Sequence, residues 1–265
     1  MIPDQLDTAV STIQDRIGGA GSHSARARLE RLAGRTRQAR TEVVTRIRRR
    51  VFLRVEPLTH RPDVQFIGSE YGGWHVVLHS GARGGVCYSA GIGEDASFDR
   101  ALIERTGCTV HAFDPVPRVA EYVARSLAGQ PRFVFHRIGL WSTDTEITFF
   151  GPERAHWVSH SAVDFRHTPA VLEAAVRSVP SLMRELGHER LSVLKLSVEG
   201  AQFAVLEPVL AAGLPVDQIL VEFTPPVSVR KMRAQSAALR AAGYDLVGMW
   251  YSKCTFVRRD LRVVE

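Results

Sequence analysis

Residues 85–98 place a short apolar strand, a glycine turn and the start of a helix in direct succession. The apolar run 86–90 leads into Gly91-Ile-Gly93, and a helix is predicted to begin near Asp95. Doubly wound α/β folds present a nucleotide-like cofactor with this order of elements. Glycine has no Cβ, so Gly91 and Gly93 allow the backbone to approach a ligand closely. The stretch therefore favours an α/β fold with a cofactor site at this turn.

A second predicted strand, 109–113, ends in Asp114, which is placed to accept hydrogen bonds from both ribose hydroxyls of an adenosine-bearing cofactor. The turn does not read G-x-G-x-x-G, and the carboxylates of Glu94 and Asp95 would repel a pyrophosphate. They suit a ligand with a cationic end and no phosphate. S-adenosylmethionine is therefore favoured over NAD or ATP, and no G-x-x-x-x-G-K-[ST] motif of a P-loop occurs.

Strands and helices are predicted to alternate through the rest of the chain, which indicates a parallel sheet with an antiparallel pair at its end. A hairpin over residues 65–78 is predicted to precede the sheet. Two segments interrupt the alternation: β-rich stretches at 145–150 and 157–163, followed by a helix at 170–186. The predicted strands of the main series are 86–90, 109–113, 132–137, 191–197, 217–223, 244–250 and 253–258, and its helices are 95–106, 117–127, 201–211 and 228–242.

The positive charge of the chain is concentrated at its N-terminus. Residues 1–54 hold 12 Arg and 5 acids, whereas the whole 265-residue chain has a formal charge of only +6. Helices are predicted at 3–18 and 24–50, so we expect an Arg-rich helical arm over 1–60 and a catalytic domain over 61–265. The arm is interpreted either as a surface for an acidic partner or as a solvated amphipathic helix. Its Leu and Val stripe also makes a homodimer through the arm a hypothesis.

The cysteines and the N-terminal composition indicate a reducing, cytoplasmic location. Cys87, Cys108 and Cys254 show no C-x-x-C spacing, and the first two are predicted to be buried thiols. The first twenty residues contain acids and no long apolar region, so no signal peptide is expected. No apolar run is long enough for a membrane span. No cluster has metal-ligand spacing, so no bound metal is expected.

Several segments together resemble the FkbM-type S-adenosylmethionine-dependent methyltransferases, over residues 70–258. The most specific is the Lys-x-x-x-Glu-Gly signature that follows a strand. The matching segments are Tyr88–Asp99, Val110–Pro117, Gly139-Leu140, Ser159–Ser161, Leu194–Ala201 and Ile219–Phe223, with Tyr71–Trp74 similar to the family's lead-in. The resemblance implies a Rossmann-like seven-stranded methyltransferase sheet, mostly parallel with an antiparallel last strand, preceded here by the helical arm.

The resemblance also implies roles for individual residues around S-adenosylmethionine. Gly91, Gly93, Glu94 and Asp95 are expected to line its methionine end. Asp114 is expected to take the ribose, and the residues after the second and third strands are expected to enclose the adenine. The complete set of expected cofactor-binding residues is Ser89, Gly91, Gly93, Glu94, Asp95, Asp114, Pro115, Ile138, Gly139 and Ser197.

Two departures from the family pattern concern the base that methyl transfer to an alcohol requires. Ser197 stands where the family has Asp, and Thr224 stands where it has His. Serine and threonine are poor bases at neutral pH. The base could come from another side chain, the acceptor could need no strong base, or the protein could bind the cofactor without turnover. The candidate catalytic residues are His136, His160, Lys195, Glu199 and Glu222; His111, on a predicted buried strand, is interpreted as a core histidine.

The leading hypothesis is O-methylation of a hydroxyl on a small molecule, such as a sugar or a secondary metabolite. One alternative is a catalytically degenerate cofactor-binding scaffold, which the departures at Ser197 and Thr224 motivate. Another is a nucleic-acid methyltransferase guided by the basic arm, but residues 61–265 contain no Asn-Pro-Pro-Tyr or Asp-Pro-Pro-Tyr motif. The sequence does not identify the acceptor.

Overall fold

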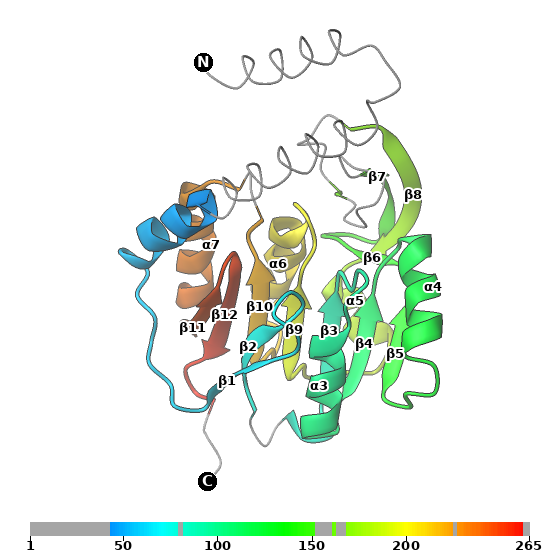
Figure 1. Ribbon diagram of the computed structural model, residues 1–265, viewed down its shortest axis with the longest axis horizontal. Helices are drawn as coiled ribbons and strands as arrows, with labels where there is room; N and C mark the ends of the chain where they lie inside the picture. Colours follow the sequence, from blue (N-terminus) through cyan, green and yellow to red (C-terminus); the bar gives the residue numbers. More distant parts are fainter. Residues whose placement is uncertain (1–42, 79–81, 152–160, 163–167, 225–226, 262–265) are drawn as a thin grey trace, which may run out of the picture. The chain divides into compact units, whose positions relative to one another are not determined.

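The computed structural model of the chain describes residues 43–78, 82–151, 161–162, 168–224 and 227–261 (Figure 1). The chain divides into two compact units, residues 1–47 and 48–265, and every described strand lies in the second. The predicted helix at 3–18 and the first part of the one at 24–50 lie outside the described residues. Residues 43–53 are helical, so this helix continues past its predicted end.

The second unit is built on a seven-stranded sheet, as expected for a Rossmann-like methyltransferase. Its strand order is β11-β12-β10-β9-β3-β4-β5. Neighbouring strands are parallel except for β12, which pairs antiparallel with both β10 and β11. The strands are β3 (Val86–Ala90), β4 (Thr109–Phe113), β5 (Phe133–His136), β9 (Val193–Leu196), β10 (Gln218–Glu222), β11 (Tyr244–Trp250) and β12 (Lys253–Arg258).

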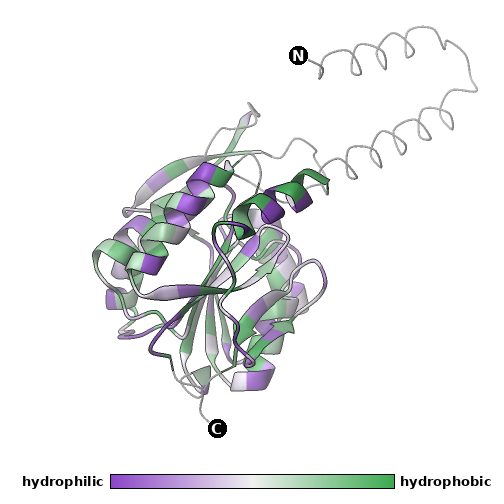
Figure 2. Ribbon diagram, turned by 90° about the vertical axis from the view of Figure 1, so that its left-hand side faces the viewer, coloured by the Kyte–Doolittle hydropathy of each residue, from purple (hydrophilic) through white to green (hydrophobic). Residues whose placement is uncertain are grey.

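Helices cover both faces of this sheet, because the inner strands are apolar on each side. Figure 2 shows strands through the middle of the body with helices on either side. Tyr88 of β3 faces one buried cluster with α5, α6 and α7, while Cys87, its neighbour, faces another with α3 and α4. All three cysteines are buried free thiols, which confirms that prediction. The helices are α3 (Ser97–Thr106), α4 (Pro117–Ser126), α5 (Val179–Glu185), α6 (Gln202–Ala211) and α7 (Val229–Ala241).

A hairpin precedes the main sheet, as predicted. Its strands β1 (Val64–Ile67) and β2 (Trp74–Val77) are antiparallel, and Ile67 lies opposite Trp74. Trp74 is almost completely buried, and β2 contacts β10, β11 and β12. The turn between the two strands, residues 68–73, therefore lies beside the main sheet.

The predicted helix at 170–186 is wrong in its first half. Residues Ala170–Arg177 form strand β8, which pairs with β7 (Thr145–Phe150) and β6 (Gly139–Leu140) in a separate three-stranded sheet. Ala, Leu and Glu dominate this segment and favour a helix, but Leu172, Ala174 and Val176 are less exposed than the residues between them. This period of two fits antiparallel pairing with β7. The helix begins only after Ser178, whose hydroxyl caps α5.

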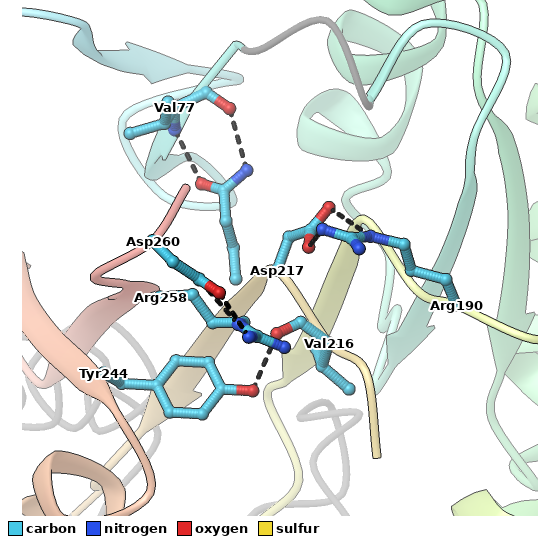
Figure 3. A network of polar contacts seen from close by, with 8 residues as sticks. Val77, Arg190, Val216, Asp217, Tyr244, Arg258 and Asp260 are labelled. Carbon is cyan, nitrogen blue, oxygen red and sulfur yellow. Dashed lines mark hydrogen bonds and ion pairs between the residues drawn. The ribbon is translucent and has the colours of Figure 1, made fainter. Parts of the chain in front are cut away.

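Polar contacts fix the amino ends of the central strands (Figure 3). The fully buried Asp217, just before β10, forms an ion pair with Arg190, with an Nε–Oδ2 distance of 3.1 Å. The next residue, Gln218, joins β10 to β2 through two 2.8 Å hydrogen bonds with the backbone N–H and C=O of Val77. The Tyr244 hydroxyl donates to the carbonyl of Val216, so this edge of the sheet is held by contacts within the protein.

Candidate active site

The glycine turn after β3 approaches the end of β9 closely, whereas the approach to a ligand that the sequence predicts stays a prediction. Gly91 has φ +76° and Gly93 has φ +57°, both in the left-handed region that glycine tolerates. A Cβ at Gly91 would lie 2.1 Å from the carbonyl oxygen of Ser197. The Gly91 carbonyl accepts a 2.9 Å hydrogen bond from Lys195 Nζ. The turn is therefore pressed against the end of β9, where only glycine fits.

Asp114 lies beside this turn and holds it in place. Its Oδ2 accepts hydrogen bonds from the N–H groups of Ile92 (3.0 Å) and Gly93 (3.2 Å), and its Oδ1 accepts one from Val116 (3.1 Å). Burial raises the pKa of this carboxyl, and the three N–H donors oppose that rise. A carboxylate has about four acceptor positions, so Asp114 keeps capacity for a further donor such as a ribose hydroxyl.

The two acids after the turn are each bound by protein groups. Glu94 forms an ion pair with Arg118 through contacts of 2.8 and 2.9 Å. Asp95 accepts hydrogen bonds from Ser69 Oγ (2.5 Å) and the N–H of Ser97 (2.9 Å). Burial would raise the pKa of Asp95, but these hydrogen bonds outweigh it and the pKa is lowered. Arg118 thus offsets the charge of Glu94 that the sequence argument assigned to a cationic ligand.

The residues expected around the adenine meet at the start of the second sheet. Gly139 opens β6, and a Cβ there would lie 3.0 Å from Val176, 3.1 Å from Phe149 and 3.8 Å from Pro115 Cγ. Ile138 precedes it and packs against the core as a partly buried side chain. The structure therefore brings Pro115, Ile138 and Gly139 close to Asp114, although they come from different strands of the chain.

A buried polar group lies under the glycine turn. Ser89 of β3 and Lys195 of β9 are register partners and are only 2% and 4% exposed. Asp99 of α3 is fully buried and accepts no hydrogen bond of ordinary geometry from the described residues. Burial raises its pKa, while the charge of Lys195 and the nearby Ser89 hydroxyl lower it. Lys195 thus holds the turn through its hydrogen bond to the Gly91 carbonyl and acts as a positioning residue.

Glu222, at the end of β10, is held by two serines. Its Oε2 accepts a 2.7 Å hydrogen bond from Ser197 Oγ, and its Oε1 accepts a 3.0 Å hydrogen bond from Ser252 Oγ. Its side chain is half-buried. Ser197 also contacts the glycine turn through its carbonyl, so it connects Glu222 to that turn. The residue that replaces the family's Asp therefore orients a neighbouring carboxylate.

Further charged and aromatic groups surround Glu222. Lys253 Nζ donates to the carbonyls of Tyr71 and Gly73 and lies 5.2 Å from the centre of the Trp74 ring. Burial lowers the pKa of Lys253, and the charge of Glu222 opposes this. The Glu199 carbonyl accepts a 2.9 Å hydrogen bond from Ser161 Oγ. These contacts place the Glu199 turn and the Tyr71 turn at the same edge of the sheet as Glu222.

The candidate base His136 does not join this group. His136 lies 3.0 Å from His111, Nε2 to Nδ1, and stacks on the Phe113 ring at 4.9 Å. Both histidines contact the core on the α5 side of the sheet, and burial lowers the pKa of each, that of His111 to about 4. His111 is thus only 8% exposed and packs in the core, as predicted. His160 lies outside the described residues.

Sequence reasoning missed three residues that the fold brings to the site: Ser252, Lys253 and Asp99. Ser252 lies in the turn between the last two strands and Lys253 opens β12, and antiparallel pairing returns both to the carboxyl end of β10. A polar Ser-Lys pair inside an otherwise apolar hairpin was the available signal. For Asp99 the signal was an acid beside Phe98 on the apolar face of α3.

The glycine turn and the Glu222 carboxylate thus lie at the same edge of the sheet, and Ser197 contacts both. Among the residues with described side chains, no three His, Cys, Asp or Glu residues gather as metal ligands. Within the same part of the chain, no helix combines the length and apolar character needed to cross a membrane.

Two curated proteins are similar to this chain in sequence. The human and rat proteins called probable methyltransferase-like protein 24 are 23% identical over 194 residues and 25% identical over 177 residues. These alignments cover 73% and 66% of this chain but only 44% and 41% of the relatives, so the chain spans less than half of their length.

Two solved structures are also similar. One is the FkbM methyltransferase of Methylobacillus flagellatus KT, at 12% identity and a TM-score of 0.44, covering 66% of this chain and 44% of that one. The other is the 23S rRNA methyltransferase ErmE, at 13% identity and a TM-score of 0.37, covering 69% of this chain and 65% of that one. The family described as Methyltransferase FkbM domain matches residues 81–246, which is more than half of the chain. The chain therefore belongs to the FkbM methyltransferase family.

Proposed function

We propose that this chain is an S-adenosylmethionine-dependent O-methyltransferase that acts on a hydroxyl of a small molecule. The proposal depends on one observation, which is that Ser197 connects the glycine turn to Glu222. Ser197 contacts the glycine turn through its carbonyl and donates a 2.7 Å hydrogen bond to Glu222 through its hydroxyl. A cofactor at the turn and an acceptor at Glu222 would then be neighbours.

The residues of the turn fit S-adenosylmethionine. Gly91 packs against the Ser197 carbonyl, and this contact fixes the turn beside Asp114 and the end of β9. Asp114 retains acceptor capacity for ribose hydroxyls, and Pro115, Ile138 and Gly139 offer an apolar side for the adenine. When bound, S-adenosylmethionine supplies an electrophilic methyl group on a sulfonium.

Glu222 is the best placed general base among the candidates. Its carboxylate accepts hydrogen bonds from Ser197 and Ser252, and these fix its orientation while leaving acceptor capacity. In the proposed reaction Glu222 would take the proton of the acceptor hydroxyl. S-adenosylmethionine, when bound, would supply the methyl group to the acceptor oxygen and leave as a neutral thioether. Glu222 then releases the proton to water.

The test combines cofactor binding with a matched pair of variants. Calorimetric titration with S-adenosylmethionine and S-adenosylhomocysteine should give micromolar binding, about −8 kcal/mol. Glu222→Gln should keep this affinity and lower turnover by about 10²- to 10⁴-fold. Ser252→Ala should lower turnover less, because one orienting hydrogen bond remains. No binding of either ligand would exclude the proposed cofactor, and full activity of Glu222→Gln would exclude Glu222 as the base.

The contacts of Glu222 weaken the alternative that the chain binds the cofactor without catalysis. It was motivated by the absence of the family's Asp and His at Ser197 and Thr224. The hydrogen bond from Ser197 to Glu222 offers a different carboxylate at the same edge of the sheet. The departures therefore do not by themselves remove the means of deprotonating an acceptor.

A further inference from the structure

Two fully buried aspartates differ in their partners. Asp217, just before β10, forms an ion pair with Arg190. Asp99, in the first turn of α3, is equally buried, but among the described residues no protein group makes a hydrogen bond of ordinary geometry with either of its carboxylate oxygens. Burying a carboxylate without such partners is unfavourable. Asp99 therefore adds little to the stability of the fold, and its place beside the candidate site suggests a role there.

Asp99 lies in the layer between α3 and β3. Its neighbour Phe98 and Cys87 of β3 belong to the same buried cluster. Ser89 is two residues after Cys87 on the same strand, so its side chain points to the same face of the sheet. The Ser89 hydroxyl is also buried and has no hydrogen-bond partner of ordinary geometry in the described part of the chain. The layer thus holds a carboxylate and a hydroxyl directly under the strand end that leads into the glycine turn.

Lys195 brings a positive charge into this layer. It is the register partner of Ser89 on β9, and its Nζ donates a 2.9 Å hydrogen bond to the Gly91 carbonyl. Burial raises the pKa of Asp99, and the charge of Lys195 is the strongest of the effects that oppose this rise. Burial also raises the pKa of Asp114, and the charge of Lys195 is again among the effects that oppose it. One ammonium group therefore lies within the field of two buried carboxylates.

The glycine turn is held at two points, and both involve these charges. The Lys195 ammonium binds the carbonyl of its first glycine, and Asp114 Oδ2 accepts hydrogen bonds from the N–H groups of Ile92 (3.0 Å) and Gly93 (3.2 Å). An ammonium drawn to Asp114 would leave the carbonyl and compete with these N–H groups for Oδ2. A negative charge at Asp99 opposes that movement, because it attracts Lys195 as well.

We propose that Asp99 is a positioning residue for the cofactor and acts through Lys195. Its charge keeps the ammonium on the Gly91 carbonyl and away from Asp114, so that the turn and the Asp114 carboxylate stay in the arrangement that binds the ribose. This inference rests on the proposed function, because it takes S-adenosylmethionine as the ligand of the turn. Asp99 is fully buried and touches no ligand itself. An unfavourable buried group that supports a binding site is a known compromise between stability and function.

The first variant, Asp99→Asn in the full chain, keeps the size of the side chain and removes its charge. Its melting temperature should stay the same or rise, because the fold loses an unfavourable buried charge and Lys195 keeps Asp114 nearby. Calorimetric titration should show that the affinities for S-adenosylmethionine and S-adenosylhomocysteine both fall by about 10-fold, since both ligands carry the ribose. A merely structural role predicts the reverse, a lower melting temperature with unchanged affinities.

Asp217→Asn is the matched control, because Asp217 is an equally buried aspartate with an ion-pair partner at the opposite ends of the strands. This variant loses the pair with Arg190, so its melting temperature should fall. At a temperature where it is folded, it should bind both ligands as the wild type does. The two aspartates should therefore separate, one changing affinity and the other changing stability.

A double-mutant cycle tests whether Asp99 acts through Lys195. Lys195→Met should itself lower the affinity for both ligands, because the Gly91 carbonyl loses its donor. Adding Asp99→Asn to Lys195→Met should change the affinity by less than about 2-fold, since no ammonium remains to be positioned. A further loss of about 10-fold in the double variant would show that Asp99 acts by another route, and would overturn the inference.

Amide hydrogen exchange, followed by NMR without cofactor, reports on the turn directly. Asp99→Asn should speed exchange of the Ile92 and Gly93 amides by about 10-fold, because their hydrogen bonds to Asp114 meet a competing ammonium. The amide of Val110 in β4, which donates to the Arg132 carbonyl, should exchange at the wild-type rate. A general loosening of the fold would instead speed exchange at all three amides.

The outcomes separate this inference from the proposed function. If the wild-type chain binds S-adenosylmethionine and folded Asp99→Asn binds it equally well, the inference is wrong and the proposed function stands. If the wild type binds neither ligand, the proposed function fails, and hydrogen exchange alone decides about Asp99. Faster exchange confined to Ile92 and Gly93 would then support its positioning of the turn, and unchanged exchange would overturn it.

Discussion

The amino ends and the carboxyl ends of the strands form two edges of the seven-stranded sheet, and their polar residues differ in burial and in hydrogen bonding. At the amino edge, Asp217 and Gln218 are fully buried and are bound by Arg190 and Val77. At the carboxyl edge, Glu222 is half-buried, Tyr251 has a positive φ and an exposed side chain, and the glycine turn packs against the end of β9. The first edge holds the strands together, whereas the second is where we propose that the ligands bind. This separation is typical of open α/β sheets, whose ligands bind beyond the carboxyl ends of the strands.

The largest effect is expected at Gly91, where a Cβ would both strain the backbone and overlap Ser197. Gly91→Ala should lower cofactor affinity by about 100-fold or more, since relieving the overlap moves the turn. Gly107→Ala is the matched control. Gly107 has φ +65° but nothing within 4 Å of its Cβ position, so this variant should lose only about 1–2 kcal/mol of stability. Calorimetric titration of both variants measures the difference, and equal losses of affinity would contradict the assignment.

The buried pair His111 and His136, on β4 and β5, should make the free energy of unfolding depend on pH in the acid range. Burial, together with the nearby His188 and His136, lowers the pKa of His111 to about 4 in the folded protein, against about 6.5 in the unfolded chain. Between these values the unfolded chain binds more protons, so the free energy of unfolding falls as the pH decreases. The stabilisation is fully present above about pH 6.5, and on the order of 3 kcal/mol is lost by about pH 4.

Urea denaturation at several pH values measures this loss, and His111→Phe is the comparison. The variant has no group to titrate at this position, and its ring can still stack beside His136. Its free energy of unfolding should therefore change less between pH 6.5 and pH 4 than that of the wild type. An identical slope in the two proteins would mean that other groups account for the pH dependence.

An intermediate loss of stability is expected for a substitution at the amino edge, and cofactor affinity should not change there. Gln218→Leu removes two 2.8 Å hydrogen bonds between β10 and β2. At about 1 kcal/mol for each, the loss should be about 2 kcal/mol. Affinity for S-adenosylhomocysteine at a temperature where the variant is folded should match the wild type. A large loss of affinity would show that the two edges are not independent.

The sequence predicted the main sheet well, because its buried strands are short apolar runs between clear helices. Strands 244–250 and 253–258 were placed at their exact limits. Residues 170–177 were assigned to a helix, because Ala, Leu and Glu dominate them and only pairing with β7 makes them a strand. Local composition carries no information about that partner.

The candidate site was predictable where its residues are neighbours in the sequence. Gly91 and Asp114 each follow a strand, so the order of elements placed both at one edge. Ser252 and Tyr71 belong to hairpins whose position depends on how they pack against β10. No pattern in the sequence predicts this packing. The Arg-rich arm and its proposed role in dimerisation remain predictions, since residues 1–42 lie outside the described part of the chain.

The smallest effect on stability and on cofactor affinity is expected at Glu94, which lies at the carboxyl edge but is bound by Arg118. The sequence predicts that Glu94 faces the cationic end of the cofactor, but Arg118 contacts both of its carboxylate oxygens. The pair is partly exposed, so breaking it should cost less than about 1 kcal/mol of stability. With its charge offset, Glu94→Gln should change the affinity for S-adenosylmethionine by less than about 3-fold.

Arg118→Ala decides what Glu94 does when its partner is removed. A carboxylate released from Arg118 would attract the sulfonium of S-adenosylmethionine more than the neutral sulfur of S-adenosylhomocysteine. If Glu94 faces the cofactor, this variant should bind S-adenosylmethionine more tightly and leave S-adenosylhomocysteine binding unchanged, and the gain should disappear at high salt. If the affinities for both ligands stay the same, Glu94 serves only to join the turn to α4, and the negative charge near the cofactor comes from Asp95 and Asp114 alone.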